Sequence, residues 1–219
     1  MSSRLRKFVE RSATLGLTPC EDAADRLERF TVMILNKGVR LALVSKADLG
    51  PRSLADKHFA DARSALLFAG PPPGARVLDF GAGAGVVGVT WSLLRPDLRV
   101  TLLESRHKKA HFLRTVVEGL PVENAVVLEG RGEDAAPPHS FDLVVSRGMA
   151  TDRKILRAYH DLLAPEGSVF LFKGPESGSA AIELLASDGR FAAPETIEIS
   201  LPHEKVRVFV KAVRAEPEE

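Results

Sequence analysis

A short glycine-rich segment holds the residues best suited to ligand chemistry. An apolar run that begins at Val77 leads into Asp79, and Gly81, Gly83 and Gly85 follow at alternate positions. Glycines at such a turn let the backbone approach a ligand where any side chain would collide with it. The turn also places the free N–H groups of a helix start beside that ligand. The sequence therefore predicts a ligand-binding turn between a strand and a helix.

Two cofactor classes fit this turn, and the position of its carboxylate distinguishes them. The segment from Gly83 to Gly88 matches the dinucleotide pattern G-x-G-x-x-G, with Glu104 downstream as the acidic residue. In that register Asp79 would repel the pyrophosphate. A register that begins at Gly81 places Asp79 at the strand end, where it suits the amino and sulfonium groups of S-adenosylmethionine. Glu104 would then accept hydrogen bonds from the ribose hydroxyls. We favour the methyl donor, with the dinucleotide and a structural turn as alternatives.

Polar residues also follow the later strands of the predicted sheet. Gly132 and Glu133 come after the third strand, Arg147 after the fourth, and Lys173 after the fifth. Ligands of α/β proteins bind at the carboxyl edge of the sheet, so we expect these residues to lie near the cofactor. The segment 130–134, which contains them, is predicted to meet the edge of its adenine through the backbone and an acid. The alternatives are a surface salt bridge for Arg147 and a solvated strand end for Lys173.

The elements that position these residues fall on two sides of a proline-rich break at 70–74. Before the break, apolar residues at helical spacing over 21–35 and 53–68 predict a small helical module of two or three helices. After it, strands are expected at residues 76–80, 100–103, 125–128, 141–146 and 168–172, with helices at 86–94, 108–118 and 152–163 between them. This alternation predicts a parallel sheet. A final pair, 196–201 and 206–213, is joined too closely for a crossover and predicts an antiparallel hairpin.

Composition limits the function classes. The chain has 219 residues, 45% hydrophobic and 27% charged, which excludes disorder as its main state. Its single cysteine, Cys20, excludes a disulfide framework and a cysteine-based zinc site. His107 and His111 share a helical face but lack a third ligand, so no metal is expected. No apolar run reaches the roughly 20 residues of a membrane span, and no secretory signal is recognisable, so we expect a cytoplasmic protein.

Charge gives a weaker indication. The net charge of +1 does not mark a nucleic-acid binder. Residues 1–20 are nevertheless basic, and 216–219 form an acidic end. The basic segment is either a solvated terminus or an arm that contacts phosphate, and the same two interpretations apply to the run from Arg106 to Lys109.

Several of these motifs together resemble one enzyme family. The loop at 79–88, Arg95-Pro96-Asp97, the segment 102–114, Val145-Ser146-Arg147 and Phe172-Lys173-Gly174 are similar to the bacterial small-subunit ribosomal RNA guanine-N7 methyltransferases, also called the glucose-inhibited division protein B family. The resemblance covers roughly residues 20–213. It implies a Rossmann-like class I methyltransferase: a helical extension over 1–70, an S-adenosylmethionine-binding domain with a mostly parallel seven-stranded sheet over 74–214, and an acidic tail over 215–219.

The resemblance also implies roles for particular residues. Those expected to hold the methyl donor are Asp79, Gly81, Gly83, Gly85, Val86, Glu104, Gly132, Glu133 and Arg147. Those expected at the catalytic face are Arg147, Lys173, His58 and Asn36. Leu35 precedes Asn36 where the family has a tryptophan, and Lys57 precedes His58 where the family has an arginine.

The implied substrate is a guanine of 16S ribosomal RNA, as free RNA or in the small subunit. Apart from the resemblance, we expect a monomer. Because guanine N7 carries a free lone pair, its methylation needs positioning and no general base. A methyltransferase for a small molecule or a protein, or a methyl-donor-binding protein without activity, are the alternatives.

Overall fold

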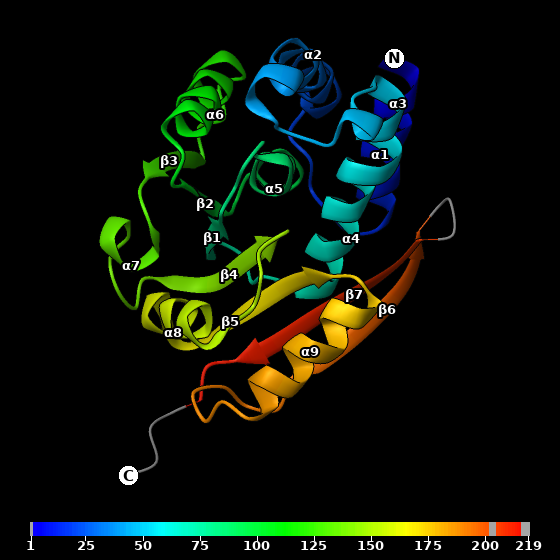
Figure 1. The fold of residues 1–219 in the computed structure, drawn as a ribbon. Helices are drawn as coiled ribbons and strands as arrows, with labels where there is room; N and C mark the ends of the chain where they lie inside the picture. The colour runs from blue at the N-terminus through cyan, green and yellow to red at the C-terminus, as the bar shows by residue number, and fades with distance from the viewer. Residues whose placement is uncertain (1, 202–204, 216–219) are drawn as a thin grey trace.

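A seven-stranded sheet forms the centre of the protein (Figure 1), for which a computed structural model describes residues 2–201 and 205–215. The strands are β1 (Arg76–Phe80), β2 (Arg99–Glu104), β3 (Ala125–Glu129), β4 (Phe141–Arg147), β5 (Leu163–Lys173), β6 (Glu195–Leu201) and β7 (Lys205–Val213). Their order in the sheet is β3-β2-β1-β4-β5-β7-β6. The chain order reverses between β1 and β4, and ligands of open α/β sheets bind at such a point.

Strand direction agrees with the predicted pattern. The pairs from β3 to β5 are parallel, whereas β7 runs antiparallel to both β5 and β6. The parallel pairing brings the carboxyl ends of neighbouring strands level, so that Asp79 lies opposite Leu102 and Val145. The mostly parallel sheet with a terminal antiparallel hairpin is thereby confirmed.

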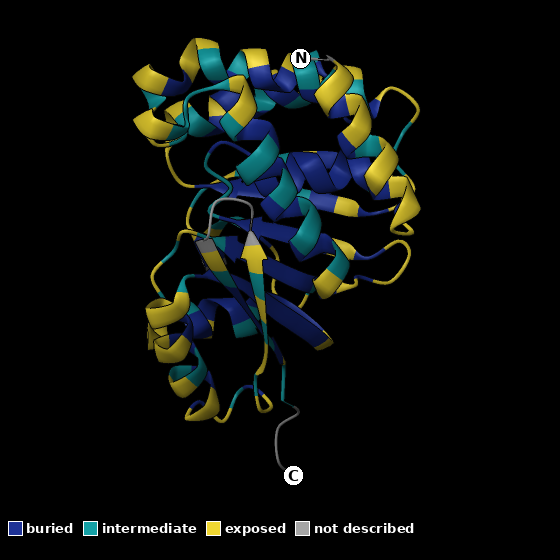
Figure 2. Ribbon diagram, turned by 90° about the vertical axis from the view of Figure 1, so that its right-hand side faces the viewer, coloured by how far each residue is buried: buried dark blue, intermediate teal, exposed yellow. Residues whose placement is uncertain are grey.

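Helices cover both faces of the sheet. After β1 they are α5 (Val86–Leu94), α6 (His107–Gly119), α7 (Gly132–Ala135), α8 (Arg153–Leu162) and α9 (Pro175–Ala186). Alternate strand residues face opposite ways, so that Val77 belongs to one core and Leu78 to the other. The first core includes α5, α6 and the N-terminal helices, and the second includes α8 and α9. Figure 2 shows buried strands at the centre and exposed residues on the outer faces of the helices.

The N-terminal segment is more regular than its sequence indicates. It comprises α1 (Ser2–Thr14), α2 (Ala23–Leu41), the short turns η1 (Lys46–Asp48) and α3 (Pro51–Ser53), a π-helical turn η2 (Leu54–Phe59) and α4 (Ala60–Ala69). The alternative of a frayed terminus was wrong, because the segment forms α1 and buries Leu5 and Phe8, although its basic side chains are exposed. Arg4 of this helix also pairs with Asp56 across the module.

The N-terminal helices are fixed to the sheet through α5. The indole Nε1 of Trp91, a fully buried residue of α5, donates a hydrogen bond to the carbonyl of Ala62 in α4 at 2.7 Å. The two segments therefore share one apolar core. Over the described residues no helix combines the length and the apolar character needed to cross a membrane. The predicted acidic tail at 216–219 lies outside the described residues.

Candidate functional site at the carboxyl ends of the strands

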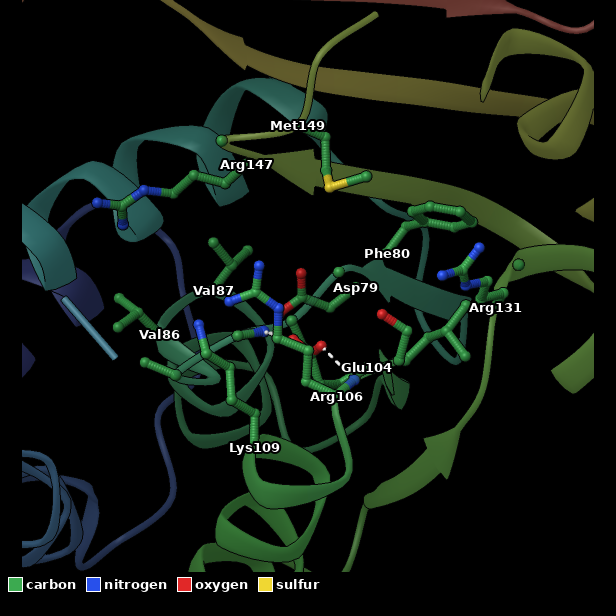
Figure 3. Close-up of a pocket in the computed structure, with 18 of the residues that line it drawn as sticks. Asp79, Phe80, Val86, Val87, Glu104, Arg106, Lys109, Arg131, Arg147 and Met149 are labelled. Atoms are coloured by element: carbon green, nitrogen blue, oxygen red, sulfur yellow. Dashed lines mark hydrogen bonds between the residues drawn. The ribbon is translucent and has the colours of Figure 1, made fainter. Parts of the chain in front are cut away.

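A cavity of about 1070 Å³ lies at the carboxyl ends of β1, β2 and β4. Figure 3 shows the side chains that surround it. Its walls come from the glycine-rich loop, the starts of α6 and α7, the segment after β4, and the loop after α2. The expected site residues that line it are His58, Asp79, Gly81, Gly83, Val86, Glu104, Gly132 and Arg147. The topology therefore gathers strand ends that are distant in sequence.

Asp79 is the buried acid of this cavity, with only 2% of the residue exposed. Its Oδ2 accepts a hydrogen bond from the backbone N–H of Gly88 in the first turn of α5 at 2.9 Å. Burial raises the pKa of Asp79 to about 7, although the Gly88 bond and the charge of Arg147 act in the opposite direction. A cationic ligand group beside this carboxylate would offset the cost of its burial.

Glu104 at the end of β2 fixes the glycine-rich loop. Its Oε2 accepts from the Gly83 N–H at 2.9 Å, and its Oε1 accepts from the Arg106 N–H at 2.8 Å. One carboxylate thus joins the loop to the segment that begins α6. Each of its oxygens retains lone-pair capacity, so Glu104 can also accept hydrogen bonds from hydroxyl groups of a ligand.

Two glycines of the loop serve close packing. Gly85 has a φ of +76°, and a Cβ there would lie 2.7 Å from Cδ2 of Leu113 in α6. A Cβ on Gly88 would lie 2.2 Å from Cδ2 of Leu102. Gly85 is not among the residues that line the cavity. Within this structure it lets α5 pack close to its neighbours, and its predicted contact with the cofactor remains a prediction.

Arg147 extends toward the N-terminal helices, away from Glu104 (Figure 3). Its guanidinium donates to Nδ1 of His58 and lies 3.8 Å from Oδ2 of Asp61, which is 1% exposed. Arg207 of β7 donates to the other Asp61 oxygen at 3.1 Å. Because arginine can only donate, Nδ1 of His58 is an acceptor and its imidazole is neutral in this arrangement.

The surroundings of His58 favour that neutral form. Burial and the charge of Arg147 lower the pKa of His58 to about 4, although the carboxylate of Asp48 acts in the opposite direction. Its Nε2 lies 3.6 Å from Oδ2 of Asp48. A hydrogen bond from Ser45, together with others from Lys57 and Ser53, lowers the pKa of Asp48. The N-terminal segment thereby supplies one ordered wall of the cavity.

Two further expected residues, Lys173 and Asn36, lie elsewhere. Lys173 is buried behind the cavity wall, where its Nζ donates to the carbonyl of Met149 at 2.9 Å. Asn36 lies on α2, in a separate hollow. The side chain of Glu133 is outside the described part of the chain. The assignments of Lys173, Asn36 and Glu133 therefore stay predictions.

Some lining residues were not predicted for the cofactor site. Asp48, Lys109, Arg131 and Met149 line the cavity from loops and from the α6 start. Lys109 was expected only as a phosphate contact. Its place in the first turn of α6, the helix that follows Glu104, could have indicated that it lines the cavity. Met149 and Asp48 lie in irregular segments, whose course follows from tertiary packing and not from periodicity.

The donors and acceptors of the cavity suit a nucleoside with a charged amino-acid part. Asp79 can face a cationic group, Glu104 can accept from hydroxyl groups, and Phe80 and Leu103 offer apolar surface. The volume of about 1070 Å³ slightly exceeds the range of about 300–1,000 Å³ for small-molecule sites, which leaves room beside a cofactor. Among the described residues no cluster of three His, Cys, Asp or Glu side chains could hold a metal ion.

The sheet order and the cavity at its carboxyl edge define the Rossmann-like fold of class I methyltransferases. The structure is similar to that of an S-adenosylmethionine-dependent methyltransferase from Aquifex aeolicus, with a TM-score of 0.62, 18% identity, and coverage of 78% of this chain and 96% of the other. At that identity the likeness shows the fold alone.

Sequence comparison gives the family. The model of the family described as rRNA small subunit methyltransferase G matches residues 23–207. Relatives named ribosomal RNA small subunit methyltransferase G include one from Symbiobacterium thermophilum, 39% identical over 76% of this chain and 72% of its own length, and one from Moorella thermoacetica, 32% identical over 84% and 80%. This chain belongs to the rRNA small subunit methyltransferase G family. The resemblance found in the sequence motifs is confirmed, and family and fold together imply S-adenosyl-L-methionine as the cofactor.

Proposed function

We propose that this enzyme transfers a methyl group to N7 of a guanine in 16S ribosomal RNA. The cavity rim supports an RNA substrate, because Arg106, Arg131 and Lys154 are exposed beside the cofactor site and Lys109 is partly exposed there. An enzyme for a small molecule should instead enclose an apolar pocket. The observation that carries the proposal is this cationic rim around the cavity, in a protein that belongs to the rRNA small subunit methyltransferase G family.

The residues of the chain act by binding and orientation. Asp79, Glu104 and the loop from Gly81 would hold S-adenosylmethionine, which supplies an electrophilic methyl group when bound. Guanine N7 needs no deprotonation, so the task of the site is to align the base and exclude water. Arg147, fixed between His58 and Asp61, is proposed to keep the substrate side of the cavity in shape. Lys173 would do the same for the segment after β4 through its bond to Met149.

The test is methylation of small ribosomal subunits and of free 16S ribosomal RNA with labelled methyl donor, followed by nucleoside analysis. We expect label in 7-methylguanosine from at least one of these substrates. An Arg147→Ala variant should lower turnover by at least about tenfold, because the cavity wall loses its central ion pair. Label in another nucleoside, or in protein alone, would contradict the proposed reaction.

A further inference from the structure

A second hollow lies between α2 and α6, beside the cofactor cavity. Its volume is about 590 Å³, within the range of small-molecule sites. Met33, Leu41 and Phe112 form its apolar part. Its polar lining consists of Asn36, Lys37, Arg40, His107, Lys108, His111 and Thr115. The hollow therefore combines an apolar floor with a polar rim.

The rim carries positive charge without neutralising partners. Among the described residues that line the hollow there is no carboxylate. Over the described residues, Lys37, Arg40 and Lys108 have no carboxylate within ion-pair distance, and all three are exposed. His107 differs, because its Nδ1 lies 2.7 Å from Oε1 of Glu129. Three free cations beside an apolar floor complement a ligand that has both an anionic and an apolar part.

The two hollows share a boundary. The Nζ of Lys109 in α6 donates to the carbonyl of Ala42, just after α2, at 3.1 Å. Lys109 lines the cofactor cavity and Lys108 the second hollow, so adjacent residues of one helix face the two sites. An RNA strand that leaves the cofactor cavity across this contact would reach the second hollow directly.

We propose that the second hollow binds a nucleotide of the RNA substrate close to the methylated one. The base would lie on the apolar floor of Met33, Leu41 and Phe112, and the phosphates would lie against the three free cations. This inference rests on the proposed function. An unpaired nucleotide presents both a flat apolar face and a charged phosphate within one unit, a combination that a run of acidic residues lacks.

The first test removes two of the cations. A Lys37→Ala/Lys108→Ala variant should bind a 16S ribosomal RNA fragment about tenfold more weakly and reduce the slope of log Kd against log salt by about one to two, because each phosphate contact contributes about one. Arg99→Ala/Arg157→Ala is the matched control, since it removes the same charge from exposed positions outside both hollows. Calorimetry with S-adenosylhomocysteine should give the same Kd for all three proteins.

A second variant tests the site without shortening any side chain. Asn36→Asp adds a carboxylate of equal size to the rim, so it should weaken RNA binding by about threefold or more while Tm and cofactor affinity stay at the wild-type values. Unchanged RNA affinity and salt slope in both variants would overturn the inference. So would weaker cofactor binding in the double variant, because the two hollows would then not act separately.

The arms of the experiment also distinguish the inference from the proposed function. If the wild-type enzyme neither binds nor methylates the RNA, the proposed function fails. If it does both and the variants match it, only the nucleotide site fails. A polyglutamate peptide that binds the wild type and not the double variant, with RNA affinity unchanged, would assign the hollow to a protein partner and overturn the inference.

Discussion

At the scale of single residues, the site depends on an acid that is buried before any ligand arrives. Asp79 is almost inaccessible, and one of its oxygens accepts from the Gly88 N–H. Its pKa is raised to about 7, so near neutral pH the free enzyme is a mixture of protonated and ionised forms. A cationic ligand group binds the ionised form better. The affinity for the methyl donor should therefore depend on pH around neutrality.

The expected result is tighter cofactor binding as the pH rises. For a pKa of about 7 in the free enzyme, the Kd for the methyl donor should fall about tenfold between pH 6 and pH 8 through ionisation of this carboxyl. Calorimetry across this interval measures the change. Asp79→Asn provides the control, because it keeps the size of the side chain and cannot ionise.

The amino group of the ligand also titrates, and this changes the affinities of the wild type and of Asp79→Asn by the same factor. Its effect therefore cancels in the ratio of the two affinities. That ratio should rise with pH over the interval. A ratio independent of pH would show that Asp79 does not face the cationic part of the cofactor.

The sequence predicted those site residues that lie at the ends of strands. Asp79, Glu104 and Arg147 lie in the cavity because parallel strands bring their carboxyl ends together. Lys173 follows the same rule, yet its side chain bonds to Met149 behind the wall. Sequence gives the strand position of a residue, whereas the direction of a long side chain depends on neighbours that only the fold supplies.

At the scale of elements, the turn into α5 is held by a glycine that packs against α6. Gly85→Ala would combine an unfavourable φ of +76° with a Cβ 2.7 Å from Leu113. We expect the free energy of unfolding to fall by about 2–5 kcal/mol, from backbone strain and overpacking together. Urea denaturation measures this change.

Gly74 provides a matched control for that substitution. It has nearly the same φ, +75°, but a Cβ there would have nothing within 4 Å. Gly74→Ala should therefore cost only the backbone strain of about 1–2 kcal/mol. Equal losses in the two variants would contradict the assignment of Gly85 to close packing against Leu113.

Element prediction succeeded where periodicity was strong and failed where small or polar residues hide it. The helix at 86–94 was predicted with the bounds that α5 has. The helix α9 was not predicted, because its first turn is Pro-Glu-Ser-Gly, and its buried residues are Gly178, Ala181 and Leu185. The helix α1 is rich in charge, and its apolar stripe at Leu5 and Phe8 is short.

At the scale of the whole molecule, a partly buried ionic cluster joins the N-terminal helices to β4 and β7. Asp61 of α4 lies beside Arg147 of β4 and Arg207 of β7, and His58 accepts from Arg147. No sequence pattern predicts this cluster, because its members lie far apart in the chain. Its formation depends on the shared core that places α4 over the sheet.

This cluster makes stability depend on pH. The pKa of His58 is lowered to about 4 from 6.5, so between these values the unfolded chain binds more protons than the native one. Stability from this residue is therefore present at neutral pH and is lost on acidification. The expected loss between pH 7 and pH 5 is about 2 kcal/mol.

The measurement must separate His58 from Asp79, whose raised pKa has the opposite effect over the same interval. His58→Asn keeps an acceptor for Arg147 and cannot gain a proton. As the pH falls from 7 to 5, the unfolding free energy of the wild type should therefore decrease by about 2 kcal/mol relative to that of His58→Asn. A difference that stays constant with pH would show that His58 is not held neutral.

The position of β7 affects how the chain can fold while it is being synthesised. This strand lies between β5 and β6 and also carries Arg207, the partner of Asp61. Until β7 has emerged from the ribosome, the β5 edge stays uncovered and available for pairing with other chains. A nascent chain therefore needs this one segment both to cover β5 and to supply the second arginine beside Asp61, which leaves the β5 edge open to aggregation until β7 has formed.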